Sequence, residues 1–396
     1  MATANPIPGD TSTAEHAAAD LLVLATAMQP EQSEGMMAHL AEVFSAESVI
    51  VATQDEVAAH VSSPLRVVPI SRSNTAWTKT PADFINAFEA GHEHEAKAVL
   101  MLGPGADSLS PLALRSLADG VLHEAIDLVM PRYIIPPNTG FINSAILYPL
   151  TRTLFAARTR FPLGLDMCLS ISMAERMATA AHRFNNSGQD EALLWPVNEA
   201  IACGASVDEI DAGPRTLPQP ANVDISAILA FVTGSLFGDI EAKAAVWQRP
   251  RRPPMMHQAV PSASPAGTPD DVASMVEAFR LAYANLQEIW SLVLPPHSLL
   301  LLKRFSTVDA SAFRMPEGLW ARIVYDFLIA YRLRTINRGH LMGALIPLYL
   351  AWVAGHINVT ASGTAPERHI EAVAAAFEAD KPYLVARWRW PDRFNS

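Results

Sequence analysis

The chain has 396 residues, of which 50% are hydrophobic and 17% charged, so it can bury a large core and is not a disordered protein. Its 40 acidic residues outnumber its 29 basic ones, and the formal net charge of -11 argues against non-specific nucleic-acid binding. The two cysteines, Cys168 and Cys203, show no Cys-x-x-Cys spacing, which argues against a disulfide framework and favours a reducing cytoplasm.

In the first half of the chain, short apolar runs alternate with amphipathic stretches. Strands are predicted at residues 21–25, 48–52, 66–70, 98–102 and 127–130. Helices are predicted at residues 35–44, at 81–90 and from Ser110-Pro111 onward, where a first-turn proline loses no hydrogen bond. This alternation predicts βαβ units with a mostly parallel sheet, and ligands of such sheets bind beyond the carboxyl ends of the strands.

From about residue 221 the pattern is helical. Helices are predicted at residues 224–237, 241–247, 270–294, 316–334, 337–357 and 367–377. Asn337 can cap one of them. The stretch 249–269 is rich in proline and serine, which indicates an extended linker. The predicted organisation is therefore an α/β domain at 1–248, a linker at 249–269 and an all-α domain at 270–396.

Two segments bear on the membrane and on export. Residues 1–20 have no basic region followed by an apolar core, so no secretory signal is predicted. Residues 341–357 are apolar but short for a bilayer and contain Pro347, which favours a buried helix over a membrane span. We therefore expect a cytoplasmic protein.

Several segments together resemble one protein family. Residues 142–152 read INSAILYPLTR and residues 160–170 read RFPLGLDMCLS. They are similar to the YPLTR helix and the RQPIGGDFG loop of bacterial GT-A glycosyltransferases related to mannosylglycerate and glucosylglycerate synthases. The stretches LWARIVYDF at 319–327, NRGHL at 337–341, PLYL at 347–350 and KPYLV at 381–385 continue the likeness. It extends from about Ala19 to Trp388.

The resemblance implies a GT-A, Rossmann-like α/β domain at 1–248 that binds a nucleotide sugar and carries the catalytic site, followed by the all-α region. It implies transfer of a sugar from a nucleoside diphosphate sugar to a small, possibly glycerate-like hydroxylated acceptor, with retention at the anomeric carbon. The alternative is a catalytically inactive relative that keeps the fold for binding or as a scaffold. Recruitment of the pocket to a different substrate also stays open.

Two aspartates are the catalytic candidates that the resemblance implies. Asp166 lies in a loop with Gly164 and would position the acceptor or stabilise the anomeric centre. Asp190 matches a Gly-x-Asp that precedes a helix predicted at residues 192–202. The simpler interpretation is that Asp166 is an ordinary loop residue and that Asp190 is an N-cap.

The metal-binding motif of the family is not recognisable in this chain. Gly103 and Gly105 stand where relatives carry Asp-x-Asp, and glycine offers no side-chain ligand. The relatives' histidine after a GPK turn is also missing, because Gly213-Pro214-Arg215 is followed by Thr216 and Leu217. No metal ligands are therefore predicted, and the sequence argues against a bound Mg²⁺ or Mn²⁺ and for diphosphate neutralisation by basic residues.

The remaining candidates are assigned by position relative to the family's segments. The donor-binding candidates are Lys79, Asp107, Ser108, Arg215 and Asp55. The acceptor-binding candidates are Arg132, Asn138, Thr139 and Gly164. A solvated loop lysine and a surface arginine are the competing interpretations of Lys79 and Arg132.

Aromatic residues recur at helical spacing in the last third of the chain. They are Trp320, Tyr325, Phe327, Tyr331, Tyr349 and Trp352. This spacing favours a core or a subunit interface over sugar-stacking platforms. If part of the set is exposed, a homodimer is plausible. The expected partners are thus a nucleotide sugar and a small-molecule acceptor, with a second copy in the case of a homodimer, and no nucleic acid.

Overall fold

A computed structural model describes residues 19–26, 30–58, 63–70, 77–136, 138–186, 192–218, 224–249 and 269–391. Its centre is a seven-stranded sheet with the strand order β3-β2-β1-β4-β6-β5-β7. Only β6 runs antiparallel to its neighbours, β4 and β5. The strands are β1 (Leu21–Ala25), β2 (Val49–Gln54), β3 (Arg66–Ile70), β4 (Ala98–Leu102), β5 (Leu128–Ile134), β6 (Met167–Ser170) and β7 (Val207–Pro214).

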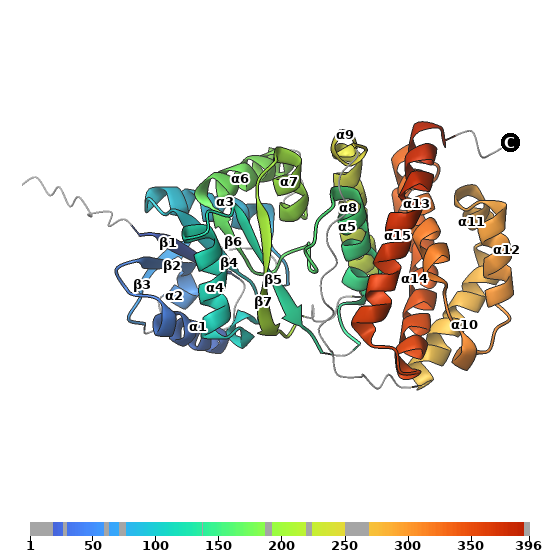
Figure 1. Cartoon of the computed structure of the whole chain (residues 1–396), viewed down its shortest axis with the longest axis horizontal. Helices are drawn as coiled ribbons and strands as arrows, with labels where there is room; N and C mark the ends of the chain where they lie inside the picture. The colour runs from blue at the N-terminus through green and yellow to red at the C-terminus, as the bar shows by residue number, and fades with distance from the viewer. Residues whose placement is uncertain are drawn as a thin grey trace, which may run out of the picture.

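The central strands are apolar along their whole length because helices cover both faces of the sheet. Every residue of β1 and β4 is buried. Helices α1 (Pro30–Val43) and α4 (Pro111–Leu122) pack on one face. Helices α3 (Pro81–Glu93), α6 (Ile171–Asn186) and α7 (Pro196–Cys203) pack on the other (Figure 1). The short helices α2 (Asp55–Ala58) and η1 (Ala106–Ser108) follow β2 and β4.

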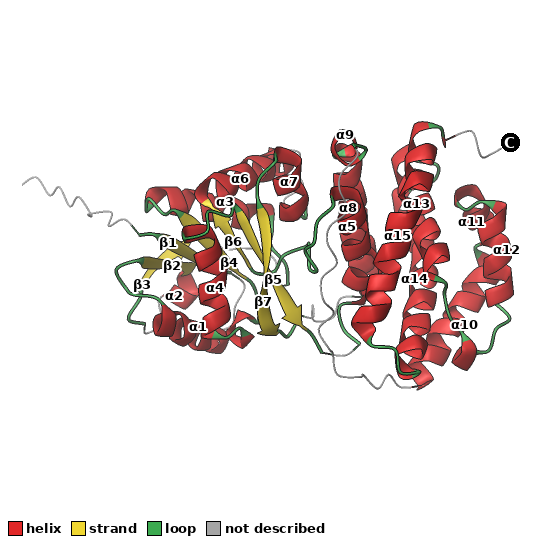
Figure 2. Cartoon of the chain, in the orientation of Figure 1, coloured by secondary structure: helices red, strands yellow, loops and turns green. Residues whose placement is uncertain are grey.

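The other half of the molecule contains only helices (Figure 2). From the C-terminal part of the chain come α10 (Pro269–Asn285), α11 (Gln287–Val293), α12 (Pro296–Phe305), η3 (Ala310–Ala312), α13 (Glu317–Leu333), α14 (Arg338–Ala361) and α15 (Pro366–Arg389). The prediction of a mostly parallel α/β domain followed by a helical region is confirmed.

Four helices from the first 248 residues join this helical half. They are η2 (Asn143–Leu147), α5 (Tyr148–Phe155), α8 (Ile225–Ala242) and α9 (Ala244–Trp247). Their apolar side chains share one core with α10 to α15. The indole Nε1 of Trp320 in α13 donates to the carbonyl of Ala145 in η2 at 2.8 Å. The predicted linker at 249–269 lies outside the described residues except at its two ends.

Two described helices, α8 and α14, are long and apolar enough to cross a membrane by length and composition alone. The apolar segment at 341–357 falls within α14, and 67% of the apolar window of that helix is buried inside the protein, compared with 33% for α8. Residues 341–357 therefore form a mostly buried helix, as predicted.

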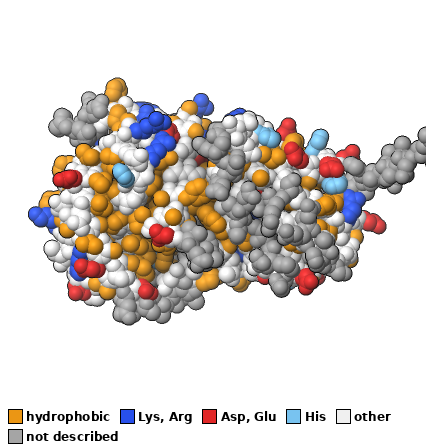
Figure 3. All heavy atoms as spheres, turned by 180° about the vertical axis from the view of Figure 1, so that it is seen from behind, with side chains coloured by type: hydrophobic (Ala, Val, Ile, Leu, Met, Phe, Trp, Pro, Cys, Tyr) orange, Lys and Arg blue, Asp and Glu red, His pale blue; other side chains and the backbone are white. Residues whose placement is uncertain are grey.

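All six aromatic residues that the sequence singled out are buried in the chain's own core. They give no support to a subunit interface, and the homodimer stays a prediction. Apolar side chains do reach the surface over the half of the molecule that holds the C-terminal helices (Figure 3). Among the exposed large apolar residues of that half are Leu281, Leu292 and Leu300. Both cysteines are free thiols.

Candidate functional site

Chain segments far apart in sequence meet at the carboxyl edge of the sheet. Strand β4 ends at Leu102 and leads into Gly103. Asp166 directly precedes β6, and because β6 is antiparallel to β4, its first residue lies at the same edge. Arg215 follows β7, and its backbone N–H donates to the carbonyl of Ile134 at the end of β5 at 3.0 Å. The sheet topology thus gathers these residues where a parallel sheet binds ligands.

The carboxylate of Asp166 is fully occupied by protein donors. Its Oδ1 accepts from the Gly103 N–H at 2.9 Å and from Arg215 Nη2 at 3.2 Å. Its Oδ2 accepts from the Tyr133 hydroxyl at 2.7 Å and from Arg215 Nε at 2.9 Å. The four interactions match the roughly four acceptor positions of a carboxylate. With 0% of either side chain exposed, Asp166 and Arg215 form a buried ion pair.

The guanidinium of Arg215 is equally saturated. Its Nη2 also donates to the carbonyl of Pro104 at 2.8 Å, and Nη1 contacts Ser108 Oγ at 3.4 Å and the carbonyl of Thr216 at 3.3 Å. With the two bonds to Asp166, all five N–H donors have an acceptor. Burial alone would lower the pKa of Arg215, but the charges and hydrogen bonds of Asp166 and Tyr133 together outweigh it and raise the pKa, so the guanidinium stays charged.

Tyr133 completes the cluster as a neutral donor. Burial is the main reason that its pKa lies well above the usual value, and the negative charge of Asp166 adds to the effect. The hydroxyl therefore keeps its proton and donates a hydrogen bond to Asp166. Sequence analysis assigned no role to Tyr133. The sequence signal that could have found it was the alternation of side chains along β5. This alternation places Tyr133 on the opposite face of the sheet from Arg132.

Lys79 lies beside this cluster and is buried. Its Nζ donates to Thr26 Oγ1 at 2.9 Å and to the carbonyl of Leu102 at 2.5 Å. Burial lowers its pKa to about 8, although the carboxylates of Asp83 and Asp166 act in the opposite direction. Asp83 itself caps the start of α3, accepting from the Thr80 N–H at 2.7 Å. Lys79 is thus not the solvated lysine of the simpler interpretation.

The loop from Gly103 to Gly105 leaves no room for the aspartates of the family motif. A Cβ at Gly103 would lie 2.9 Å from the carbonyl oxygen of Leu165. A Cβ at Gly105, whose φ is +78°, would lie 2.6 Å from Arg215 Nη1. The nearby Asp107 has a buried Oδ1 without a hydrogen-bond partner. Within the described part of the chain, no three or more His, Cys, Asp and Glu side chains are grouped so that they could hold an ion.

The predicted acceptor residues lie apart from the buried pair or play a backbone role. Arg132 binds Asp211 of β7, with Nε 2.7 Å from its Oδ1. Asn138 is exposed with φ at +57°, and the hydroxyl of Thr139 donates to the carbonyl of Pro136 at 2.5 Å. Gly164 has φ at +60°, and a Cβ there would lie 2.8 Å from the methyl of Met167. Gly164 therefore permits the tight turn that delivers Asp166.

Three further predicted residues complete the set. Ser108 contacts Arg215, as described, and its hydroxyl donates to the carbonyl of Gly105 at 2.6 Å. Asp55 is the first residue of α2, and its side chain lies outside the described atoms. Asp190 lies outside the described residues altogether. From the predicted set, the buried cluster therefore contains Lys79, Asp166 and Arg215, and the exposed Ser108 contacts it through Arg215.

No protein-family model and no curated protein sequence matches the chain. Among solved structures, glucosyl-3-phosphoglycerate synthase from Mycobacterium tuberculosis with phosphoglyceric acid aligns at 15% identity over 56% of this chain and 80% of that chain, with a TM-score of 0.38. The same enzyme with Mn²⁺, uridine diphosphate and glucosyl-3-phosphoglycerate aligns at 15% identity over 61% and 87%, with a TM-score of 0.39. At these values the likeness assigns neither an activity nor a substrate to this chain.

These structures correct one prediction. Several of them contain Mn²⁺ or Mg²⁺ together with uridine diphosphate. The sequence-based argument against a divalent metal rested on the missing Asp-x-Asp motif and on the missing histidine after Gly213-Pro214-Arg215, and it does not stand. What the chain itself shows is narrower: among its described side chains no group of metal-ligating residues is assembled.

Proposed function

We propose that the protein transfers a sugar from a nucleoside diphosphate sugar to a small hydroxylated acceptor, at the carboxyl edge of the sheet. The observation that supports this most is the convergence of Lys79, Tyr133, Asp166 and Arg215, which come from four separate segments, on one edge of a mostly parallel sheet. Ionisable groups gathered at such an edge are typical of a ligand site.

The two kinds of charge in this cluster correspond to the two demands of the reaction. A departing diphosphate needs cationic or hydrogen-bonding partners, which Lys79 and Arg215 can supply. The anomeric centre becomes positively charged, and a carboxylate such as Asp166 can stabilise it or hold the acceptor hydroxyl. A glycerate-like acceptor with a retained anomeric configuration is the version of this reaction that the sequence resemblance favours.

The geometry sets a condition on this mechanism. Asp166 and Arg215 bind each other and their neighbours with all their hydrogen-bonding capacity. For either to contact a substrate, the ion pair has to open. A diphosphate can drive this step, because it competes with Asp166 for the guanidinium and releases the carboxylate in the same movement.

The same saturation favours a second candidate function, namely binding of a nucleotide sugar or a related ligand without transfer. A buried, fully hydrogen-bonded ion pair is typical of a structural element, and breaking it is costly. In this case the cluster holds the edge of the sheet closed, and Asp166 never meets a substrate.

Calorimetry and turnover together distinguish the two candidates. A panel of uridine, guanosine and adenosine diphosphate sugars is titrated into the protein with Mg²⁺ or Mn²⁺ present, and product formation is followed with glycerate and 3-phosphoglycerate as acceptors. Transfer requires that Asp166→Asn lowers turnover by about a hundredfold or more, as for loss of an electrostatic partner of the transition state.

The matched control is Asp119→Asn, since Asp119 lies on the surface of α4, where Arg115 and His123 are its ionic partners among the described residues. It should leave turnover unchanged. Donor binding without hydrolysis or transfer would establish the second candidate in place of the first. Absence of binding by every donor in the panel would refute both.

A further inference from the structure

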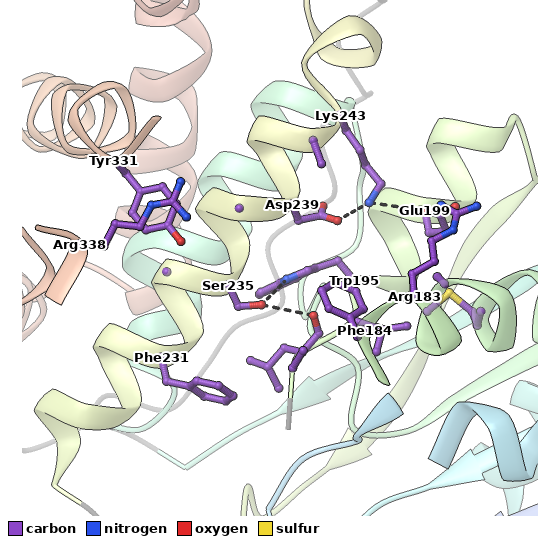
Figure 4. Close-up of a pocket in the computed structure, with 18 residues that line it drawn as sticks. Arg183, Phe184, Trp195, Glu199, Phe231, Ser235, Asp239, Lys243, Tyr331 and Arg338 are labelled. Atoms are coloured by element: carbon purple, nitrogen blue, oxygen red, sulfur yellow. Dashed lines mark hydrogen bonds and ion pairs between the residues drawn. The ribbon is translucent and has the colours of Figure 1, made fainter. Parts of the chain in front are cut away.

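A cavity of about 930 Å³ lies between the helices that cover the sheet and the helical half of the molecule. One wall comes from α6, the stretch 192–195 and α7, and the other from α8, Tyr331 of α13 and Arg338 of α14 (Figure 4). None of the residues of the buried ion-pair cluster lines it. The volume is within the range of small-molecule sites, roughly 300–1,000 Å³.

Small residues on α8 create the space. Gly234, Gly238 and Ala242 recur every four residues and so lie on one face of the helix, facing the cavity. A Cβ at Gly234 or Gly238 would meet only Tyr331 and Met342, at 3.9–4.0 Å, so nothing fills the volume that the missing side chains leave. Only 33% of the apolar window of α8 is buried. An apolar ligand body would cover the exposed apolar part of α8 that lines the cavity.

The carboxylates of the cavity are already neutralised. Lys243 pairs with Glu199 at 3.2 Å and with Asp239. Arg176 adds a bond to Glu199 at 2.7 Å, and Asn198 donates to Asp239 at 2.9 Å. This network closes one end of the cavity and leaves neither negative charge to attract a cationic ligand.

The opposite side carries donors without acceptors. The Arg338 guanidinium stacks on the ring of Tyr331 at 3.8 Å and binds Glu241 through Nη2, but its Nε is buried without a hydrogen-bond partner. The Tyr331 hydroxyl makes no hydrogen bond with any described residue. Across the cavity, Arg183 has no ionic partner in the described part of the chain. An arginine can only donate, so the missing ligand atoms are acceptors.

We propose that this cavity binds a small amphipathic anion, whose carboxylate or phosphate head meets Arg338 and Tyr331 while its apolar body lies along Gly234 and Gly238. Phe231 and Leu193 supply apolar surface on either side of that body. Figure 4 shows Tyr331 and Arg338 together on one side and Arg183 on the other, where its charge adds to the attraction. The inference is independent of the proposed sugar transfer, because the two sites share no residue.

Calorimetric titration of the full chain with octanoate, octyl phosphate and 1-octanol tests the proposal. Either anion should bind, with 1-octanol weaker by about tenfold, which is the ratio expected when one charged hydrogen-bonded contact is lost. Preference for octanoate or for octyl phosphate identifies the head group. Arg338→Gln and Tyr331→Phe should weaken binding of the anions much more than binding of 1-octanol, because they remove the positive charge and the phenolic donor that would meet the anionic head group.

Gly238→Leu should abolish binding of all three probes, since its side chain would fill the space beside the Tyr331 hydroxyl. Leucine has a higher helix propensity than glycine, so the variant should fold. The matched control is Gly343→Leu on α14, where a Cβ meets nothing within 4 Å and no cavity wall is involved. Arg368→Gln on the surface of α15 controls for a general loss of positive charge.

Three results would overturn the proposal. They are failure of both anions to bind, equal affinity for 1-octanol and the anions, and binding to Gly238→Leu as tight as to the unmodified chain. If circular dichroism shows that Gly238→Leu is unfolded, the affinities of Arg338→Gln and Tyr331→Phe for the anions still test the proposal. Unchanged affinity in both variants would show that the cavity does not recognise an anion.

Discussion

At the scale of single residues, the Asp166–Arg215 pair is the most completely buried ion pair among the described residues. Both side chains are 0% exposed, and each is the principal partner of the other. Removing one partner leaves an uncompensated buried charge, which typically costs about 3–5 kcal/mol. We therefore expect Arg215→Gln to destabilise the chain by that amount in denaturant unfolding, with Tyr133 and Gly103 still bound to Asp166.

A double-mutant cycle isolates the pair. Adding Asp166→Asn to Arg215→Gln removes the stranded charge, so the double variant should be more stable than the sum of the single effects by about 1–3 kcal/mol. Simple additivity would mean that the two side chains are not coupled in the folded state.

The burial of Lys79 leads to a prediction about how the stability of the fold depends on pH. Its pKa is about 8 in the folded chain, against 10.5 for an ordinary lysine, because burial disfavours the charged form. Between these values the unfolded chain binds more protons than the folded one, so stability rises with pH. The unfolding free energy of the unmodified chain minus that of Lys79→Met should therefore increase from pH 8 to about pH 10.5. The full change is on the order of 3 kcal/mol.

Measuring the same difference in Lys97→Met provides the control, because Lys97 is an exposed partner of Asp20 on the surface. A flat difference for Lys79→Met across this range would show that Lys79 keeps an ordinary pKa.

The sequence predicted that Asp166 and Arg215 belong to one site, but not that they bind each other. They are 49 residues apart, and the likeness to glycosyltransferases assigned them separate tasks. Their contact depends on the order of strands, which places β6 between β4 and β5 and β7 at the sheet edge. Which strands are neighbours in a sheet depends on contacts between distant segments, and the hydrophobic periodicity of one segment does not predict those contacts.

At the scale of elements, the first five strands were predictable from their apolar runs, and β6 and β7 were not. Strands β1 and β4 match their predicted bounds because apolar runs are their signal. Strand β6 has four residues, and β7 is an edge strand in which every residue except Ala212 is at least partly exposed. The helix predicted at 270–294 is interrupted near Leu286, the cap of α11, where no glycine or proline marks the break.

The start of α14 was predicted from its cap, and the geometry makes the prediction testable. The Asn337 side chain accepts from the backbone N–H groups of Gly339 at 2.8 Å and His340 at 3.4 Å. Asn337→Ala should lower the unfolding free energy by about 1 kcal/mol, because those donors lose their acceptor. Asn337→Asp keeps the acceptor and should cost much less. Equal losses in the two variants would show that the side-chain oxygen does not matter.

At the scale of the whole molecule, the boundary in sequence and the boundary in space differ. The predicted α/β domain ends at 248, but α5 and α8 lie within it and pack into the core of the helical half. Ion pairs reinforce this attachment. Arg152 of α5 binds Glu371 of α15 at 2.5 Å and Glu378 at 3.0 Å, and Arg160 binds Glu367 at 3.1 Å. The two halves are therefore joined by apolar and ionic contacts.

This joint core leads to a prediction about fragments. A fragment of residues 1–248 would expose the apolar faces of α5 and α8 that α13, α14 and α15 cover in the full chain. Exposure of such a surface costs about 25 cal/mol per Å². We expect the fragment to unfold at lower denaturant concentration than the full chain, or to aggregate, and to regain its stability when residues 269–396 are supplied in trans. A fragment whose cooperative transition coincides with that of the full chain would instead establish residues 1–248 as an independent domain.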